Sequence, residues 1–293
     1  MKIHVTDYDE LRNWFTDFAG DSYDIMIVEG SAGTGKSQIA RESIKNLDPK
    51  DYCFLEGRIS AVCLYEKLYR HRDQPIYIDD VDGLYADRQC VNLLKCVCQT
   101  NSDKSVMWNT RGIKGMPSDF TTRSKVCIIT NNWRALNKHV GAVEDRGILI
   151  PFHPTPYAVH DYVGNNLIDC DWFDDEIFIF IGELLPVIIN PSIRHYRNCK
   201  QIKSAGRNWR AVMAESCGLS ETEALVLKLL VGGVEGQRVS YNELAHIFSQ
   251  IANRSTRTFW RIKAEFAKKG LTCAGEAEIP ADQEDSVNGQ IDH

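Results

Sequence analysis

Eight consecutive residues, from Gly30 to Ser37, have the types and spacing of a phosphate-binding loop. They read Gly-Ser-Ala-Gly-Thr-Gly-Lys-Ser and fit the pattern G-x-x-x-x-G-K-[ST] at every fixed position. Glycines let backbone N–H groups approach a phosphate closely, and the start of the following helix favours negative charge. Lys36 is expected to reach the β- and γ-phosphates of ATP, and the Ser37 hydroxyl to ligate Mg²⁺. The predicted nucleotide-binding residues are Gly30, Ser31, Ala32, Gly33, Thr34, Gly35, Lys36 and Ser37.

The flanking segments support this interpretation of the loop. An apolar run at 24–29 indicates a buried strand before it, and residues 38–44 continue as an amphipathic helix after it. With strand, loop and helix in this order, a chance glycine-rich turn is the less favoured alternative.

Two adjacent carboxylates, Asp79 and Asp80, end a second apolar run that begins at Ile76. Asp79 is expected to hold Mg²⁺ together with Ser37, and Asp80 to act as general base toward a water molecule. The alternative is that both carboxylates only cap the next helix. Their position one strand–helix unit beyond the loop favours the catalytic interpretation.

Strand and helix patterns alternate through the first half of the chain. This alternation predicts an α/β fold with a parallel sheet covered on both faces, and ligands bind such sheets at the carboxyl ends of the strands. The predicted strands are 24–29, 52–57, 76–80, 125–131 and 148–152, and the predicted helices are 8–18, 61–69, 88–99 and 136–146.

From Thr155 onward the patterns are helical, with candidate helices at 157–167, 174–189, 193–215 and 255–269. Capping-box spacing at 220–223 and 240–243 starts two further short helices. We therefore expect an α/β nucleotide-binding domain at 1–153, an α-helical lid at 154–217, a helix-turn-helix-like module at 218–270 and an acidic disordered tail at 271–293.

The order of these motifs resembles that of the AAA+ ATPases over roughly residues 20–215. A polar residue ends the strand after the paired acids in that family, which implies that Asn131, with Asn132 the less favoured choice, senses the γ-phosphate. The family also carries an arginine before the last strand that acts on the neighbouring subunit's ATP. Arg146 has that place, and Arg123 is a competing candidate.

The resemblance also implies a second arginine sensor at the start of a lid helix, and Arg194, after Pro191 and Ser192, fits it. Both arginines have simpler alternatives. Arg146 could pair with a neighbouring acid on the surface, and Arg194 could be one more cation of a basic helix.

Two departures refine the resemblance. Most members have glutamate where this chain has Asp80, and bacterial initiator-type members resemble it in having two aspartates, which favours a slow, switch-like ATPase. Residues 61–67 lack the glycine of an aromatic pore loop, which argues against an unfoldase.

Charge is distributed unevenly behind the net value of −6. Residues 192–270 carry a net +8 and residues 271–293 a net −6, which suggests that a basic C-terminal module meets a polyanion. In the helix at 255–269, an apolar stripe is expected to pack inward, which leaves Arg257, Arg261 and Lys263 for DNA. The alternative is a basic bundle that docks a protein. A hairpin around Arg111 and Lys114 is another candidate DNA contact, and an ordinary solvated hairpin is the favoured alternative.

The composition favours a cytoplasmic protein. The chain has no run of 18 apolar residues and no secretory signal pattern, and its ten cysteines include no C-x-x-C pair. We expect an ATP hydrolase that uses ATP and Mg²⁺ between subunits of a ring or helical homo-oligomer to assemble on or remodel DNA. Its protein client would be a helicase, nuclease or transposase, and its origin a phage or mobile element. The alternative is a nucleotide-gated adaptor for a protein partner.

Overall fold

The computed structural model describes residues 1–20, 22–99, 101, 103–108, 115–133, 141–232 and 239–268. It divides into two compact units, and each is described by itself below. The first contains Met1–Cys170 with Asn190–Arg194, and the second contains Asp171–Ile189 with the chain from His195 onward. The finer domain boundaries expected from the sequence stay predictions.

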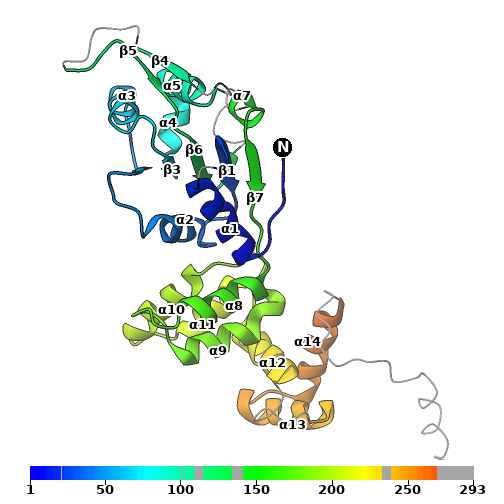
Figure 1. Ribbon diagram of the computed structural model, residues 1–293. Helices are drawn as coiled ribbons and strands as arrows, with labels where there is room; N and C mark the ends of the chain where they lie inside the picture. The colour runs from blue at the N-terminus through cyan, green and yellow to red at the C-terminus, as the bar shows by residue number, and fades with distance from the viewer. Residues whose placement is uncertain are drawn as a thin grey trace, which may run out of the picture. The chain divides into compact units, whose positions relative to one another are not determined.

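A five-stranded parallel sheet forms the centre of the first unit (Figure 1), as the alternating pattern predicts. Along the sheet the strand order is β2-β3-β6-β1-β7, so β6 lies between β1 and β3 and pairs with both. The strands are β1 (Ile25–Glu29), β2 (Cys53–Glu56), β3 (Ile76–Asp79), β6 (Val126–Thr130) and β7 (Ile148–Pro151).

Helices cover both faces of this sheet, which is why its strands are mainly apolar before their polar carboxyl ends. Alternate strand residues point to opposite faces. On one face Ile27 and Ile78 join a buried cluster with Leu64 of α3 and Leu94 of α5, and on the other Tyr77 packs edge-on against Phe18 of α1. Among the described residues, the helices of this unit are α1 (Tyr8–Ala19), α2 (Lys36–Ile44), α3 (Ala61–Arg70), α4 (Asp82–Ala86), α5 (Arg88–Val97), α7 (Gly141–Glu144) and α8 (Pro156–Asn166).

An antiparallel hairpin precedes β6, where the sequence predicts an insertion. Its strands are β4 (Lys104–Met107) and β5 (Asp119–Thr122), which pair over their full length. Arg111 and Lys114, the predicted tip residues, lie outside the described residues.

The second unit is helical. It contains α9 (Asp175–Leu184), the 3₁₀ turn Leu185–Val187, α10 (Arg194–Ser204) from its second residue onward, α11 (Trp209–Ser216), α12 (Glu221–Gly232), α13 (Tyr241–Ala252) and α14 (Thr256–Lys268). Among the described residues, no helix is both long and apolar enough to cross a membrane.

Two helices are shorter than their apolar patterns suggest. The predicted helix at 174–189 ends at Leu184 because Pro186 cannot donate a backbone hydrogen bond. The predicted helix at 193–215 is two helices, because Gly206 takes a φ of 71° and Asn208 caps the second one. Both single-helix predictions were wrong at these breaks.

The last three described helices pack on one another as a small bundle. Asn253, with a left-handed φ of 49°, ends α13 and turns the chain into α14. The predicted apolar stripe is confirmed, because Phe259, Ile262 and Phe266 are all buried. The packing of these three helices therefore depends on one left-handed residue and one apolar stripe, and the helix-turn-helix-like module stays a prediction.

Candidate nucleotide site

Glycines shape the loop between β1 and α2 because side chains do not fit there. Gly33 and Gly35 have φ angles of 79° and 87°, a left-handed region that other residues rarely adopt. A Cβ on Gly30 would lie 2.3 Å from the Phe152 carbonyl oxygen, and one on Gly33 would lie 2.1 Å from the Ser192 hydroxyl. The loop therefore needs glycines for two reasons: the backbone takes left-handed φ angles, and neighbouring atoms leave no room for a Cβ.

Residues far away in the sequence hold this loop in place. The Tyr8 hydroxyl donates to the Thr34 carbonyl at 2.9 Å, and the Tyr8 ring stacks on Tyr162 with centroids 4.1 Å apart. The Ile193 N–H donates to the Gly33 carbonyl at 2.8 Å. Sequence reasoning missed these contacts, because a tyrosine on an apolar helix face looks like ordinary core.

Lys36 lies buried beneath the loop, with only 5% of its surface exposed. Its Nζ donates to the carbonyl oxygens of Gly30 at 2.7 Å and Ser31 at 2.9 Å, and to Asn131 Oδ1 at 3.3 Å. Burial lowers the pKa of Lys36 to about 8, although the charges of Asp80 and Asp79 oppose that shift. The loop thus holds a buried cation against its own carbonyls, where a phosphate would be a better partner.

Ser37, in the first turn of α2, lies beside Asp79, the last residue of β3. The Ser37 hydroxyl donates to Asp79 Oδ1 at 2.8 Å, and Asp79 is 7% exposed. Burial raises the pKa of Asp79, the Ser37 hydrogen bond opposes this, and the charge of Asp80 adds to it. A hydroxyl and a carboxylate are the oxygen ligands that Mg²⁺ takes from a protein when phosphate oxygens supply others. The donor set therefore fits the metal predicted from the sequence.

Asp80 follows on the exposed side, with a left-handed φ of 49° that an aspartate tolerates. The Asn131 side-chain N–H donates to Asp80 Oδ1 at 3.2 Å, while its carbonyl oxygen accepts from Lys36. Because β6 lies between β1 and β3, its end brings Asn131 between the loop lysine and the acid. The structure thus brings together Lys36, Asn131 and Asp80, and places Ser37 and Asp79 beside them.

The three candidate arginines lie in different places. Arg194 is exposed near the loop, with its side-chain carbons 3.3 Å from where a Gly33 Cβ would be. Arg146 is exposed just before β7, so it lies at the opposite edge of the sheet from the loop. Strands of four or five residues at about 3.3 Å per residue separate the two edges by roughly 15 Å. Arg123 forms an ion pair with Asp103 at 2.8 Å.

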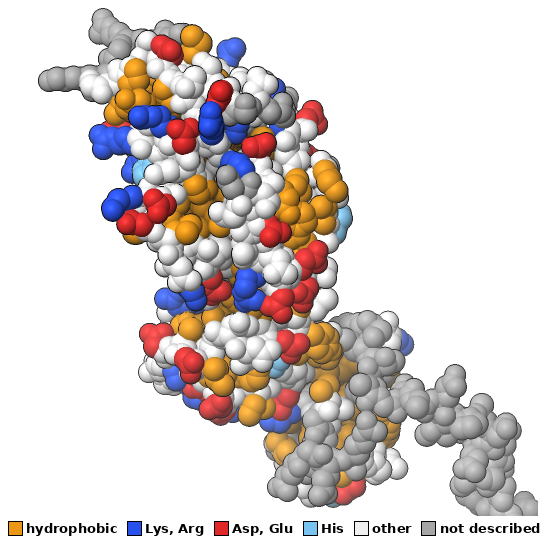
Figure 2. Space-filling model, viewed as in Figure 1, with side chains coloured by type: hydrophobic (Ala, Val, Ile, Leu, Met, Phe, Trp, Pro, Cys, Tyr) orange, Lys and Arg blue, Asp and Glu red, His pale blue; other side chains and the backbone are white. Residues whose placement is uncertain are grey.

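The three candidate DNA contacts on α14 do not share one face. Arg257 and Arg261, one helical turn apart, are exposed on the same side, and Arg261 pairs with Glu265 at 2.6 Å. Lys263 points elsewhere, with its Nζ 4.1 Å from the centroid of the Tyr241 ring. On the face shown in Figure 2, basic and acidic side chains of the described residues are interspersed, without one broad basic patch.

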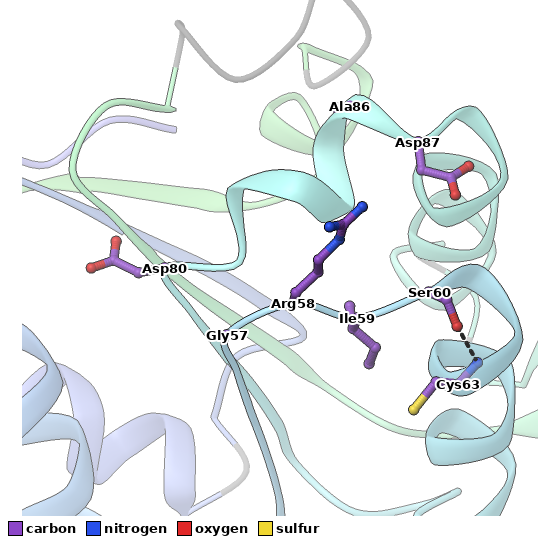
Figure 3. Close-up of a pocket in the computed structure, with 8 residues that line it drawn as sticks. All are labelled: Gly57, Arg58, Ile59, Ser60, Cys63, Asp80, Ala86 and Asp87. Atoms are coloured by element: carbon purple, nitrogen blue, oxygen red, sulfur yellow. Dashed lines mark hydrogen bonds between the residues drawn. The ribbon is translucent and has the colours of Figure 1, made fainter.

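A pocket of about 980 Å³ opens beside Asp80 (Figure 3), between the turn after β2 and helix α4. Sequence reasoning did not single out Arg58, whose side chain extends toward Ala86 in Figure 3. The only sequence signal was a glycine turn after a predicted strand. The lining residues are Gly57, Arg58, Ile59, Ser60, Cys63, Asp80, Ala86 and Asp87.

Comparison with known proteins finds resemblances of limited extent. No protein-family model matches the chain. An uncharacterized 36.7 kDa protein from the nrdC-mobD intergenic region of Enterobacteria phage T4 is 30% identical over 115 residues, which is 36% of this chain and 35% of that protein. The chain thus spans about a third of the length of this curated relative.

Solved structures resemble the chain at low identity. Domain III of the Thermotoga maritima replication initiation protein DnaA is 11% identical with a TM-score of 0.46, over 71% of this chain and 91% of that one. The Thermotoga maritima RuvB Holliday junction branch migration motor is 13% identical with a TM-score of 0.45, over 94% and 96%.

Both TM-scores are below 0.5. The sheet and the site of this chain themselves define its fold. Strand β6, which is followed by the polar residue Asn131, lies between β1, which is followed by the loop, and β3, which ends in Asp79. That order places loop, acids and Asn131 at one edge of a parallel sheet, as the motifs require. The first unit of this chain therefore has the fold of the AAA+ P-loop ATPases.

Proposed function

We propose that this chain is an ATPase that binds and hydrolyses ATP between subunits to drive assembly on, or remodelling of, DNA. The observation that carries the proposal is the linkage of Lys36 to Asp80 through the Asn131 amide, beside the Ser37–Asp79 hydrogen bond. This arrangement combines a phosphate-binding cation, a candidate metal site and a candidate general base.

Each residue has a separate task in this proposal. The loop N–H groups and Lys36 bind the β- and γ-phosphates, and Ser37 and Asp79 hold Mg²⁺, which offsets phosphate charge. Asp80 accepts a proton from the attacking water, and Asn131 orients that water while it holds the Asp80 carboxylate. Arg194, next to Gly33, contacts the phosphates from the other side of the loop.

Oligomerisation follows from the place of Arg146. An exposed arginine at the opposite edge of the sheet does not reach its own loop, so we propose that it completes the site of a neighbouring copy. A ring or helical filament of identical subunits provides that geometry at every interface. A helicase, nuclease or transposase is the kind of client that such an assembly would serve.

DNA contact is proposed for the exposed side of α14 that carries Arg257 and Arg261. A specific observation favours the adaptor alternative, in which this module binds a protein. Arg261 is already paired with Glu265, and Lys263 lies over the Tyr241 ring, so fewer cations than expected face outward together.

Nucleotide titration and phosphate release test the proposal. Lys36→Ala is expected to abolish ATP binding in calorimetry, because the buried cation is lost, whereas Lys45→Ala, an exposed lysine of the same segment, is expected to bind normally. Duplex DNA is expected to stimulate phosphate release by the unaltered protein. Equal ATP affinity of the Lys36→Ala and Lys45→Ala proteins would defeat the nucleotide site, and hydrolysis indifferent to DNA would favour the adaptor.

A further inference from the structure

Trp133, two residues beyond Asn131, is hydrogen-bonded to the last residue of β1, the strand that precedes the glycine-rich loop. Its backbone N–H donates to Glu29 Oε1 at 3.0 Å, and Glu29 directly precedes Gly30, the first residue of the loop. The Trp133 side chain is fully buried. One end of this residue is therefore fixed to the strand that carries the loop.

The other end of Trp133 reaches the segment that carries Arg146. The indole Nε1 donates to Glu144 Oε2 at 3.2 Å. Beyond Glu144 the chain forms a tight turn, in which the Arg146 N–H donates to the Val143 carbonyl at 3.2 Å and the Gly147 N–H to the Glu144 carbonyl at 3.2 Å. The residue that the indole holds, Glu144, thus lies within the turn that bears Arg146, and its carbonyl accepts from Gly147, the residue after Arg146.

A third contact joins Trp133 to the segment after the paired acids. Its ring packs edge-on against Tyr85 of α4, with centroids 5.7 Å apart and planes at 81°. Tyr85 lies five residues beyond Asp80, and Val143 belongs to the same buried cluster. Packed interiors pass small displacements on to their neighbours, so a shift at the loop or at Asp80 would be felt at the indole.

From these contacts we infer that Trp133 is a positioning residue. It couples the nucleotide state of its own subunit to the position of that subunit's Arg146, which acts on the ATP site of the neighbouring subunit. The inference rests on the proposed action of Arg146 between subunits. Glu29 and Asn131 respond to the phosphates, Trp133 carries that response through its indole N–H, and Glu144 sets the turn that bears Arg146.

Trp133→Phe removes the indole N–H and keeps the backbone N–H and a buried aromatic ring. We expect its ATP affinity to stay near that of the unaltered protein, while turnover in assemblies falls about tenfold, within the usual range of coupling between sites. Glu144→Ala is expected to reproduce the loss. Glu144→Gln, which keeps an accepting oxygen, is expected to restore near-normal turnover.

Mixed assemblies distinguish an effect on the neighbour from an effect on the subunit's own site. Trp133→Phe subunits keep an intact ATP site, and Asp80→Asn subunits keep an intact Arg146. Mixing them is expected to raise turnover above that of either alone, because the second supplies a well-placed arginine to the first. Failure of mixing to restore turnover would place the defect at the Trp133 subunit's own site and overturn the inference.

A parallel mixture of Arg146→Ala with Asp80→Asn separates the two levels of the proposal. If that mixture recovers activity while Trp133→Phe alone is fully active, Arg146 acts between subunits and only the role of Trp133 fails. If Arg146→Ala itself is fully active, the action of Arg146 fails and the role of Trp133 fails with it. Melting curves for every variant identify any that lose the fold, and Glu144→Ala and Glu144→Gln then decide the question in place of Trp133→Phe.

Discussion

Asn131 donates a hydrogen bond to Asp80 over 3.2 Å, although 51 positions separate them in the sequence. The bond exists because β6 and β3 are neighbours in the sheet and both end at the same edge. A carboxylate held in this way has one oxygen committed to an amide and the other available to a water molecule. Substitutions of Asn131 and of Asp80 are therefore expected to have separate effects on ATP turnover.

Asn131→Ala is expected to lower turnover about 10²–10³-fold, the usual effect of removing one positioned hydrogen-bond donor from a reacting centre. ATP binding should weaken little, because Lys36 keeps its place beneath the loop through two carbonyl oxygens. Steady-state kinetics and calorimetry measure both quantities. Asn132→Ala is the matched control, and a larger loss there would move the sensing role to Asn132.

Asp80→Asn is expected to bind ATP normally and to lose about 10²–10⁴-fold in turnover, because an amide has the shape of the carboxylate without its basicity. Phosphate release in single-turnover conditions gives the rate of the chemical step. Asp87, which also borders the pocket beside Asp80, offers a control as Asp87→Asn. Equal rates for the Asp80→Asn and unaltered proteins would place the base elsewhere.

Arg146→Ala is expected to leave ATP binding intact and to lower hydrolysis in assemblies, since arginines that act between subunits contribute about 10³–10⁵ in rate. A mixture with Lys36→Ala subunits should recover part of the activity, because each partner supplies what the other lacks. Subunit exchange is confirmed first by fluorescence transfer between labelled copies. Without recovery in an exchanging mixture, Arg146 is an ordinary surface cation.

The double variant Arg257→Ala/Arg261→Ala is expected to weaken DNA binding and to reduce its salt dependence. Each lost phosphate contact lowers the slope of log affinity against log salt by about 0.9. Lys263→Ala is the control on the same helix, because its Nζ lies over the Tyr241 ring. Fluorescence anisotropy across a salt series measures both. If the two proteins show the same slope, the exposed arginines are not the DNA contact.

Asp174 predicts a pH dependence of stability in the second unit. Burial raises its pKa, but hydrogen bonds from Lys203 and Lys200 outweigh this and lower the pKa to about 2. The unfolded value is about 3.9, so the ionised carboxylate stabilises the fold above pH 4 and that contribution is lost as the pH falls toward 2. The shift corresponds to about 2 kcal/mol.

Urea unfolding of the unaltered protein and Asp174→Asn at several pH values measures this contribution. Asparagine keeps the cap of α9 and removes the charge. The two proteins should differ by about 2 kcal/mol in the free energy of unfolding at pH 6, with the gap closing below pH 4. A gap that stays constant down to pH 3 would show that the charge is not the cause.

The grouping of the candidate site residues was predictable because their motifs are local. The loop glycines, Lys36 and the paired acids are each recognisable within a few residues, and the alternation of strands and helices orders them along a parallel sheet. The orientation of Lys263 could also have been predicted from the sequence. Side chains two positions apart on a helix are rotated by about 200° about its axis, so Arg261 and Lys263 cannot share a face.

Other features depend on long-range contacts or on local breaks in a pattern. In the sequence Trp133 is one apolar residue among many, and only the folded structure shows its hydrogen bonds to Glu29 and Glu144. Helix α4 has five residues, too few to show a helical period. At Gly206 the apolar pattern continues through the turn, so the break between α10 and α11 has no periodic signal.

The hydrogen bonds around Gly33 and Thr34 also bear on the order in which the chain is made. The loop sequence leaves the ribosome early, yet the groups that hold its curvature, Tyr162, Ser192 and Ile193, are translated more than a hundred residues later. A nascent chain that ends after β7 carries the complete motif without those supports. Under the proposed function, the competence to hold nucleotide would be acquired late in synthesis, and ATP would be retained only by chains already long enough to include Ile193.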